Sequence, residues 1–274
     1  MPVLNLVLIG FIGLLAGGVV NVLADDLPHY RLPRLPRYPD GARRPVVAWL
    51  GVGAFLSGRR ASPGGVKLSW RYPLAEIASA LAMLFTYAIK HDASDVSDLQ
   101  LIFWLAYMPI FVLITVVDIE HRLILFSVII PSALLALLDA ILTPTQHEPN
   151  LQRALLGGAL GFGTFFALYL GGILYTYIAI HVQKRDITEV AFGYGDVMMA
   201  TLSGLILGLE AVIFALFITV FLGAVGALVY IVGRSLRGRQ YTMHTALPYG
   251  PYIVAGTVIM LLFSTQVRFF MVGY

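Results

Sequence analysis

Long apolar runs separated by short polar segments dominate this chain of 274 residues. Eight runs approach the ~20 apolar residues that a helix needs to cross ~30 Å of hydrocarbon. They lie at residues 3–24, 72–90, 99–117, 126–143, 151–180, 196–209, 210–233 and 248–266. The sixth run is short, and Gly204 and Gly208 near its end predict a turn into the seventh. The pattern therefore predicts an all-α polytopic membrane protein of about eight transmembrane helices.

The segment between the first two apolar runs has a different character. Residues 25–71 contain "DDLPHYRLPRLPRYPDGARRP" and then "SGRRASPGGVKLSWRYP", which are too polar and too often interrupted by Pro and Gly to cross a membrane. We interpret this segment as a lobe outside the membrane. Trp49, Phe55 and Trp70 are suited to contact with the bilayer surface.

The composition supports a membrane protein and excludes several kinds of site. Apolar residues make up 59% of the chain and charged residues 12%, whereas soluble domains carry about 25% charged residues. The chain has no cysteine, which excludes disulfides and thiolate metal ligands, and its histidines lack metal-ligand spacing. No basic stripe with stacking aromatic residues is present, so we expect neither a metal nor a nucleic-acid partner.

The distribution of positive charge predicts the orientation in the membrane. If residues 25–71 lie in the cytoplasm and eight spans alternate, the cytoplasmic segments hold 15 of the 18 Lys and Arg residues. The short segment 91–98 on the other side carries three aspartates and no Lys or Arg. Because cytoplasmic loops are enriched in Lys and Arg, we expect a multi-pass protein with both termini outside. The basic lobe is suited to anionic lipid headgroups.

Two aspartates stand at the ends of apolar runs on the predicted cytoplasmic side. Asp118 follows "IFVLITVV", and Asp196 follows "FGYG". Ionisable groups near or within spans are costly and usually face a partner or a water-filled cavity. Contact of helix ends with water is the simpler explanation for either one alone. A transporter that binds protons or cations, or a non-catalytic scaffold, would also accommodate them.

The residues around Asp196 favour catalysis. Gly193, Tyr194 and Gly195 precede it, and glycine permits close approach of another backbone. Two carboxylates that share a site retain one proton between them. The ionised group can then activate a water while the protonated group polarises a peptide carbonyl. Asp118 and Asp196 are therefore candidate catalytic residues of an aspartyl protease, provided that the fold brings them together.

The chain resembles the bacterial type IV prepilin peptidases, which are membrane aspartyl proteases of the GxGD type. The resemblance is carried by "GYGDVMMATLSGLILG", "VVDIEHRLI", "LPYGPYIVAG" and, near the start of the chain, "GGVVNVLADDLP" with "KLSWRYPLAEI". It implies cleavage of prepilins or pseudopilins by Asp118 and Asp196 at the cytoplasmic face of the inner membrane. It also implies methylation of the new N-terminus with S-adenosylmethionine.

The resemblance further implies a division of labour along the chain. Residues 1–98, including the lobe, correspond to a methyltransferase-like region, and residues 99–274 to a six-span peptidase region. Asn21, Arg71, Tyr72 and Glu76 match the family's N-terminal segments and are candidates for methyl transfer or for support of the lobe. Alternatively, Asn21 and Glu76 pair or satisfy backbone groups, while Arg71 and Tyr72 anchor the chain at the membrane interface.

The chain departs from the pattern of the family it resembles at two places. Many members carry two cysteine pairs in the lobe, whereas this chain has none, so we expect no zinc and a lobe held by packing, proline and ion pairs. Leu125-Phe126 stands where members usually have Pro-Asp. Because a prepilin leader is basic, acidic residues near the predicted site are candidates for its recognition; these are Asp118, Glu120, Asp186 and Glu189.

Overall fold

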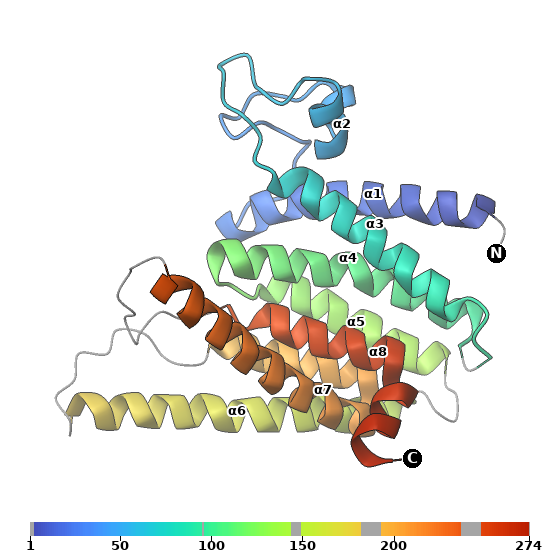
Figure 1. The fold of residues 1–274 in the computed structure, drawn as a ribbon, viewed down its shortest axis with the longest axis vertical. Helices are drawn as coiled ribbons and strands as arrows, with labels where there is room; N and C mark the ends of the chain where they lie inside the picture. Colours follow the sequence, from blue (N-terminus) through green and yellow to red (C-terminus); the bar gives the residue numbers. More distant parts are fainter. Residues whose placement is uncertain (1–2, 95, 144–148, 182–192, 237–247, 274) are drawn as a thin grey trace. The chain divides into compact units, whose positions relative to one another are not determined.

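The computed structural model describes residues 3–94, 96–143, 149–181, 193–236 and 248–273. The described part is helical, with only two isolated bridges between extended residues. Figure 1 shows the helices, which are α1 (Val3–Asp26), α2 (Gly51–Leu56), α3 (Arg71–Lys90), α4 (Asp98–His121), α5 (Phe126–Leu142), α6 (Leu151–His181), α7 (Tyr194–Leu236) and α8 (Gly250–Val272). Two short 3-10 turns lie at Leu27–His29 and Val46–Ala48.

The helices confirm the predicted class of fold. Among the described residues, six helices are long and apolar enough to cross a membrane, and α5 is a shorter apolar helix. The chain forms two compact units, Met1–Val128 and Ile129–Tyr274. The helix α4, which the sequence assigned to the peptidase region, packs with α1 and α3 in the first unit. The functional division near residue 98 stays a prediction.

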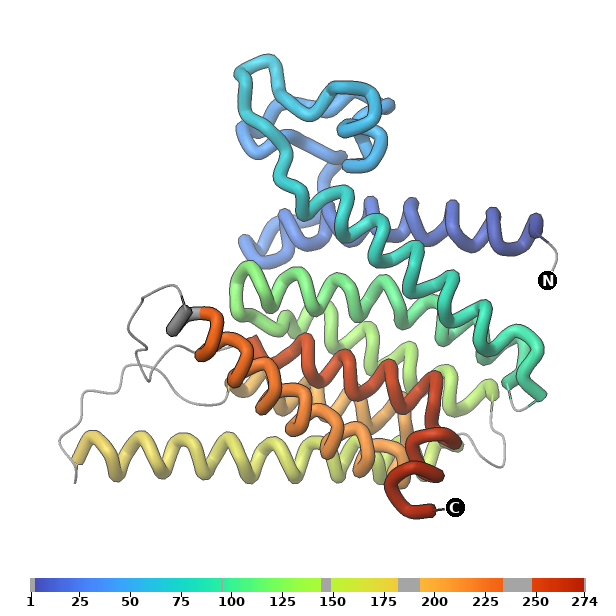
Figure 2. The backbone as a smooth tube through the Cα atoms, viewed as in Figure 1, coloured from blue at the N-terminus to red at the C-terminus, as the bar shows by residue number. Residues whose placement is uncertain are grey.

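Helix α7 contains the predicted turn between the sixth and seventh apolar runs. Gly208 has φ 75° and ψ 177°, so the helix is broken there into two parts. Ser203, before the break, hydrogen-bonds Thr257 of α8, and Thr219, after it, contacts Tyr252 of the same helix. The second part therefore runs back along α8, as the backbone tube shows (Figure 2). The prediction of two segments with a turn at Gly208 is confirmed.

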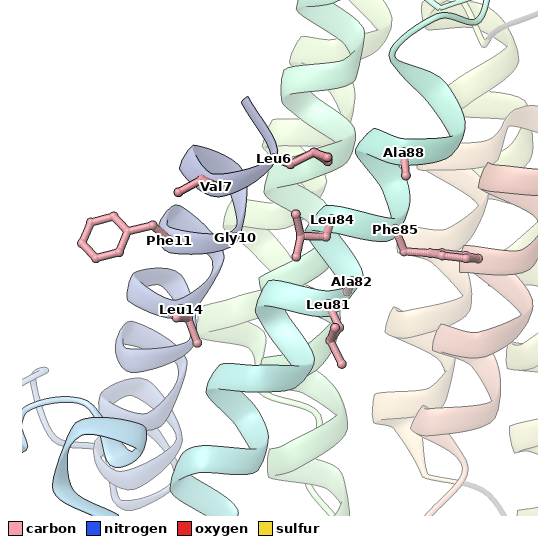
Figure 3. Close-up of a pocket in the computed structure, with 10 residues that line it drawn as sticks. All are labelled: Leu6, Val7, Gly10, Phe11, Leu14, Leu81, Ala82, Leu84, Phe85 and Ala88. Atoms are coloured by element: carbon pink, nitrogen blue, oxygen red, sulfur yellow. The ribbon is translucent and has the colours of Figure 1, made fainter. Parts of the chain in front are cut away.

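In the first unit, α1 crosses α3 through glycine. A Cβ at Gly13 would lie 2.5 Å from the Ala80 Cα, and a Cβ at Gly17 would overlap the backbone of Glu76. Beyond the crossing the two helices diverge, and an apolar groove opens between them (Figure 3). Leu14, Phe11 and Phe85 are among its lining residues. Such a lining suits contact with hydrocarbon rather than water.

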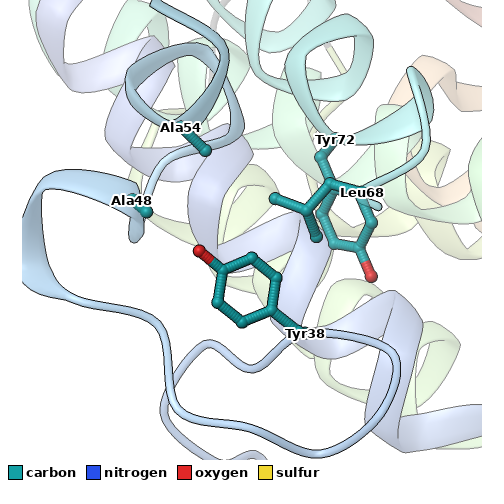
Figure 4. Packing of buried hydrophobic residues seen from close by; sticks show 5 residues of the cluster. All are labelled: Tyr38, Ala48, Ala54, Leu68 and Tyr72. Atoms are coloured by element: carbon teal, nitrogen blue, oxygen red, sulfur yellow. The ribbon is translucent and has the colours of Figure 1, made fainter. Parts of the chain in front are cut away.

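The lobe is built from two tight turns and the short helix α2. One turn is closed by the bridge Arg37↔Arg43 and the other by Ala61↔Lys67, with Gly41 and Gly65 at positive φ. A small apolar core joins the lobe to the start of α3 (Figure 4); it consists of Tyr38, Ala48, Ala54, Leu68 and Tyr72.

Hydrogen bonds link the two turns of the lobe to each other. Ser62 donates to the Asp40 carboxylate, and the Tyr38 hydroxyl donates to the Arg59 carbonyl at 2.8 Å. Together with the small core, these bonds hold the lobe in a chain without cysteine. Hydrogen bonds from Ser62 and, next, from the Ala42 amide lower the pKa of the Asp40 carboxyl from its ordinary value.

The second unit is packed through small residues. The carbonyl of Gly157 on α6 lies where a Cβ of Gly204 would stand, and a Cβ at Gly161 would overlap the carbonyl of Ala200. These pairs place α6 antiparallel to the first part of α7. In α8, a Cβ at Gly256 would lie 2.5 Å from the Thr219 hydroxyl. Small residues let helix backbones approach closely where apolar burial alone gives no preference among partners.

Candidate active site

Asp118 lies in the last turn of α4 and is buried, with 5% of its surface exposed. Its backbone carbonyl accepts a hydrogen bond from the Arg122 amide at 2.8 Å, and Arg122 has a left-handed conformation with φ 55°. This arrangement ends the helix at His121, three residues after Asp118. The aspartate is thus presented by the terminal turn of a membrane helix, at the end of the first unit where the lobe joins α3.

Asp196 lies in the first turn of α7, in the second unit. Its carboxylate Oδ2 accepts a hydrogen bond from the Gly193 amide at 3.2 Å, and its own amide donates to the Gly193 carbonyl at 3.1 Å. The side chain thus reaches back to the start of its own helix, as in a capping box. A Cβ at Gly193 would lie 3.7 Å from the same carboxylate oxygen, so glycine leaves space beside the acid.

Aromatic side chains surround the level of Asp196. Because Gly161 of α6 packs on Ala200, Phe165 one turn further on lies near the level of Asp196. The Phe165 ring lies 6.2 Å from that of Tyr249, just before α8. Tyr194 contacts Tyr169 of α6 edge to face at 5.7 Å. Asp196 therefore has partly apolar surroundings.

Two apolar helix ends extend past this level. Residues 166–181 continue α6 by on the order of 20 Å. Tyr249 packs on Gly223, so residues 224–236 of α7 likewise continue beyond it. Both extensions expose large apolar side chains, including Leu174 at 59% and Val229 at 66%. Both helices therefore present apolar surface beyond the level of Asp196.

Glu76 and Asn21 come together in the first unit, where they hold the lobe. Glu76 is completely buried and accepts hydrogen bonds from the amides of Gly51 at 2.6 Å and Val52 at 2.8 Å. The Asn21 side-chain amide donates to Glu76 at 3.0 Å and to the Tyr72 carbonyl at 2.9 Å. The Glu76 carboxylate therefore binds the first amides of α2 and attaches the lobe to α1 and α3.

Arg71 and Tyr72 form the adjoining part of this network. The Arg71 guanidinium binds Asp25 of α1 at 2.5 Å and Glu120 of α4 at 2.9 Å. The Tyr72 hydroxyl donates to Asp25 at 3.0 Å. Both residues are mostly buried, and their contacts connect α1, α3 and α4. Their predicted role as anchors at the membrane interface stays a prediction.

Sequence reasoning missed Asp25 and Arg44, which complete the network. Arg44 is 5% exposed, lies 4.3 Å from the Tyr72 ring centre and donates to the Arg37 carbonyl at 2.7 Å. Burial lowers the pKa of its guanidinium from the ordinary value. In the sequence, Arg44 is one of several arginines in a Pro- and Arg-rich segment, and nothing in that pattern distinguishes it from its exposed neighbours.

Of the remaining predicted residues, Glu120 is bound to Arg71, while Asp186 and Glu189 lie outside the described residues. Among the described residues, no group of three or more His, Asp or Glu side chains could hold a metal ion.

The fold and these residues define a polytopic membrane protein in which two helix ends present aspartates. Comparison with known proteins shows what the region that carries them is similar to. Residues 105–228, which include both Asp118 and Asp196, match the type IV leader peptidase family. This region of the chain is therefore similar to that family.

Three curated relatives are each named prepilin leader peptidase/N-methyltransferase. The protein of Stutzerimonas stutzeri is 25% identical over 92% of this chain and 76% of its own length. That of Bacillus subtilis (strain 168) is 28% identical over 81% and 76%, and that of Pseudomonas putida is 26% identical over 79% and 68%. No solved structure matches the chain significantly.

Proposed function

We propose that this chain is a prepilin leader peptidase that cleaves with Asp118 and Asp196 and also methylates the new N-terminus. The observation that carries the peptidase proposal is the family match over residues 105–228, because that region contains both aspartates and the glycine-flanked helix start. Nothing in the comparisons favours a transporter. The relatives' names support the second activity.

In the proposed reaction, the two carboxylates share one proton. The ionised carboxylate takes a proton from water, and the water oxygen attacks the scissile carbonyl. The protonated carboxyl donates a hydrogen bond to that carbonyl oxygen and then supplies the proton that the leaving amine needs. The pair titrates jointly, so neither step is assigned to one aspartate. The space beside Gly193 would admit the extended substrate backbone next to Asp196.

The substrate proposed is a prepilin or pseudopilin with a basic leader followed by an apolar helix. The leader would stay on the cytoplasmic side, where the charge bias of the chain places the lobe. Asp186 and Glu189 are proposed to attract the leader. Reversal of both charges should weaken cleavage of a prepilin with a Lys- and Arg-bearing leader. Undiminished cleavage would remove these two residues from the proposal.

The experiment that tests the peptidase mixes detergent-purified full-length protein with such a prepilin and follows loss of the leader by mass. Asp118→Asn and Asp196→Asn should each lose cleavage, because asparagine can neither take nor supply the required proton. Glu210→Gln is the matched control, since Glu210 is an exposed acid paired with Arg268 just after the break at Gly208, about four turns along α7 from Asp196. Cleavage at the normal rate by either aspartate variant would reject the assignment.

S-adenosylmethionine would supply an electrophilic methyl group for the second activity. The four predicted residues do not fit direct contact with it. The carboxylate oxygens of Glu76 already accept three hydrogen bonds, and the Tyr72 ring lies beside the Arg44 and Arg71 guanidiniums, which repel a sulfonium cation. These residues are assigned to support of the lobe, and no step of methyl transfer is assigned to them.

Methylation can be tested separately from cleavage. With S-adenosylmethionine present, the mature product should gain the mass of one methyl group at its N-terminus. Asp118→Asn, supplied with already cleaved pilin, should still add the methyl group if the two activities use different residues. An unmethylated product from the wild-type protein would limit the function to cleavage.

A further inference from the structure

Arg71 connects the start of α3, where the lobe ends, with the last turn of α4, which carries Asp118. Arg71, the first residue of α3, binds Asp25 at the end of α1 through Nη2 and Glu120 on α4 through Nη1. Its side chain is 13% exposed, and those of Asp25 and Glu120 are each 35% exposed. A single guanidinium thus joins the ends of three membrane helices, and its planar group of donors suits binding to two carboxylates at once.

Glu120 lies two residues after Asp118 in the last turn of α4. Residues two apart on an α-helix project about 200° apart, so Glu120 and Asp118 point to different sides of the turn. Arg71 therefore does not need to touch the Asp118 carboxylate in order to act on it. By holding Glu120, it fixes the rotation of a terminal turn that would otherwise be prone to fray.

The network holds Arg71 itself in place. Its guanidinium lies 4.3 Å from the Tyr72 ring centre, and the Tyr72 hydroxyl shares Asp25 as a partner. One turn further along α3, Glu76 binds the first amides of α2 in the lobe. Seating of the lobe and placement of the α4 end thus depend on neighbouring residues at the start of the same helix.

We propose that Arg71 is a positioning residue of the peptidase, which holds the α4 turn carrying Asp118 through Glu120 and couples it to the lobe. This inference rests on the proposed function. It also gives Glu120 a different role from leader recognition, because its carboxylate is already bound to Arg71 and a basic leader would have to displace that partner.

A double-mutant cycle tests the proposal with Arg71→Gln, Glu120→Gln and the double variant. Each single change should lower kcat about tenfold with little change in KM, and the double variant should be no slower than Arg71→Gln alone, because both changes break the same contact. Arg71→Lys should fall between wild type and Arg71→Gln, since it keeps the charge but loses the two-sided geometry. Arg268→Gln, which breaks the exposed Arg268–Glu210 pair, is the matched control and should cleave normally.

The cycle is run with two prepilins, one with a basic leader and one with a neutral leader. If Glu120→Gln raises KM for the basic leader alone and Arg71→Gln leaves kcat unchanged, Glu120 recognises the leader and the proposal is overturned. Additive losses in the double variant would also overturn it. Should Arg71→Gln fail to fold, Glu120→Gln and Arg71→Lys still have to show the loss of kcat. Normal cleavage by Asp118→Asn would instead reject the proposed function, so the two failures are distinct.

Discussion

Both units of this protein pack helices through glycine, but the first unit adds a buried network of charged groups. In the first unit, buried polar groups join the helices and lobe: Glu76 accepts three hydrogen bonds, and Arg71 binds two carboxylates. In the second unit, the backbones of α6 and α7 approach each other closely at Gly157, Gly161 and Gly204, which together form a glycine seam. The polar network and the glycine contacts each select which helices pack together, because apolar side chains alone give little preference among partners in hydrocarbon. A polar network can also seat a lobe outside the membrane, which a glycine seam cannot do.

The largest effect expected follows removal of the carboxylate that seats the lobe. Glu76→Ala leaves the Gly51 and Val52 amides and the Asn21 side chain without their acceptor, at about 1–3 kcal/mol for each stranded donor. The lobe should then separate from the spans, and trypsin should cut its Lys- and Arg-rich segment much faster.

Glu76→Gln serves as the graded control for that change. It keeps one carbonyl acceptor and replaces the other oxygen with a donor, so it should give an intermediate rate of cutting. Equal trypsin resistance of wild type and Glu76→Ala would show that the apolar core alone seats the lobe.

The next largest effect concerns the glycine seam of the second unit. In Gly204→Ala, the new Cβ would overlap the Gly157 carbonyl, and because the opposing atom belongs to the backbone the helices must separate, at a cost of about 3 kcal/mol or more. Gly163→Ala on α6 is the matched control, since a Cβ there meets nothing within 4 Å. The measurement is the thermal midpoint of each variant in detergent. Similar midpoints would argue against the seam.

A smaller effect is expected at the turn in α7. Gly208 has φ 75° and ψ 177°, a conformation essentially limited to glycine, so Gly208→Ala should lose about 1–3 kcal/mol through strain. Its Cβ would also lie 2.8 Å from Pro149. Gly233→Ala, beyond the turn and with open space around it, should change stability little. An unchanged unfolding midpoint for Gly208→Ala would mean that the turn relaxes without strain.

The smallest effect concerns the bond between the two turns of the lobe. Because the folded pKa of Asp40 lies below its ordinary value of about 4, its ionised form stabilises the lobe above that pH, and the stabilisation disappears as pH falls through the lowered pKa. Tryptophan fluorescence in urea should therefore show Ser62→Ala less stable than wild type at pH 7, and the difference should shrink as pH falls below about 4. Ser57→Ala, which loses only a bond to the Gly53 carbonyl, should show no such pH dependence.

Much of the helical architecture could be predicted because hydrocarbon thickness and apolar pattern act locally. The predicted runs 126–143 and 151–180 agree closely with α5 (Phe126–Leu142) and α6 (Leu151–His181). The turn near Gly208 was predictable for the same reason, since a glycine near the end of a short apolar run marks a change of direction. The resemblance of "GYGD" and "VVDIEHR" to a known family likewise selected Asp196 and Asp118.

The partners of the polar residues could not be predicted, because they lie far apart along the chain. Arg71 and Glu120 are 49 residues apart, and Asn21 and Glu76 are 55 apart. The sequence placed Glu120 among acids that could attract a leader, and only the folded unit shows it bound to Arg71. Similarly, no local pattern shows that Glu76 receives the first amides of α2.

The amino-acid sequence alone thus specified a helical membrane protein, the position of its lobe, its turn at glycine and the two aspartates that carry the family resemblance. These properties depend on neighbouring residues and on transfer from water to hydrocarbon, which each segment experiences separately. The tertiary structure decided which buried charges are paired, how the lobe is seated and which aromatic side chains lie near Asp196. Those properties depend on contacts between distant segments, since a buried polar group is stable only where the fold supplies its partner.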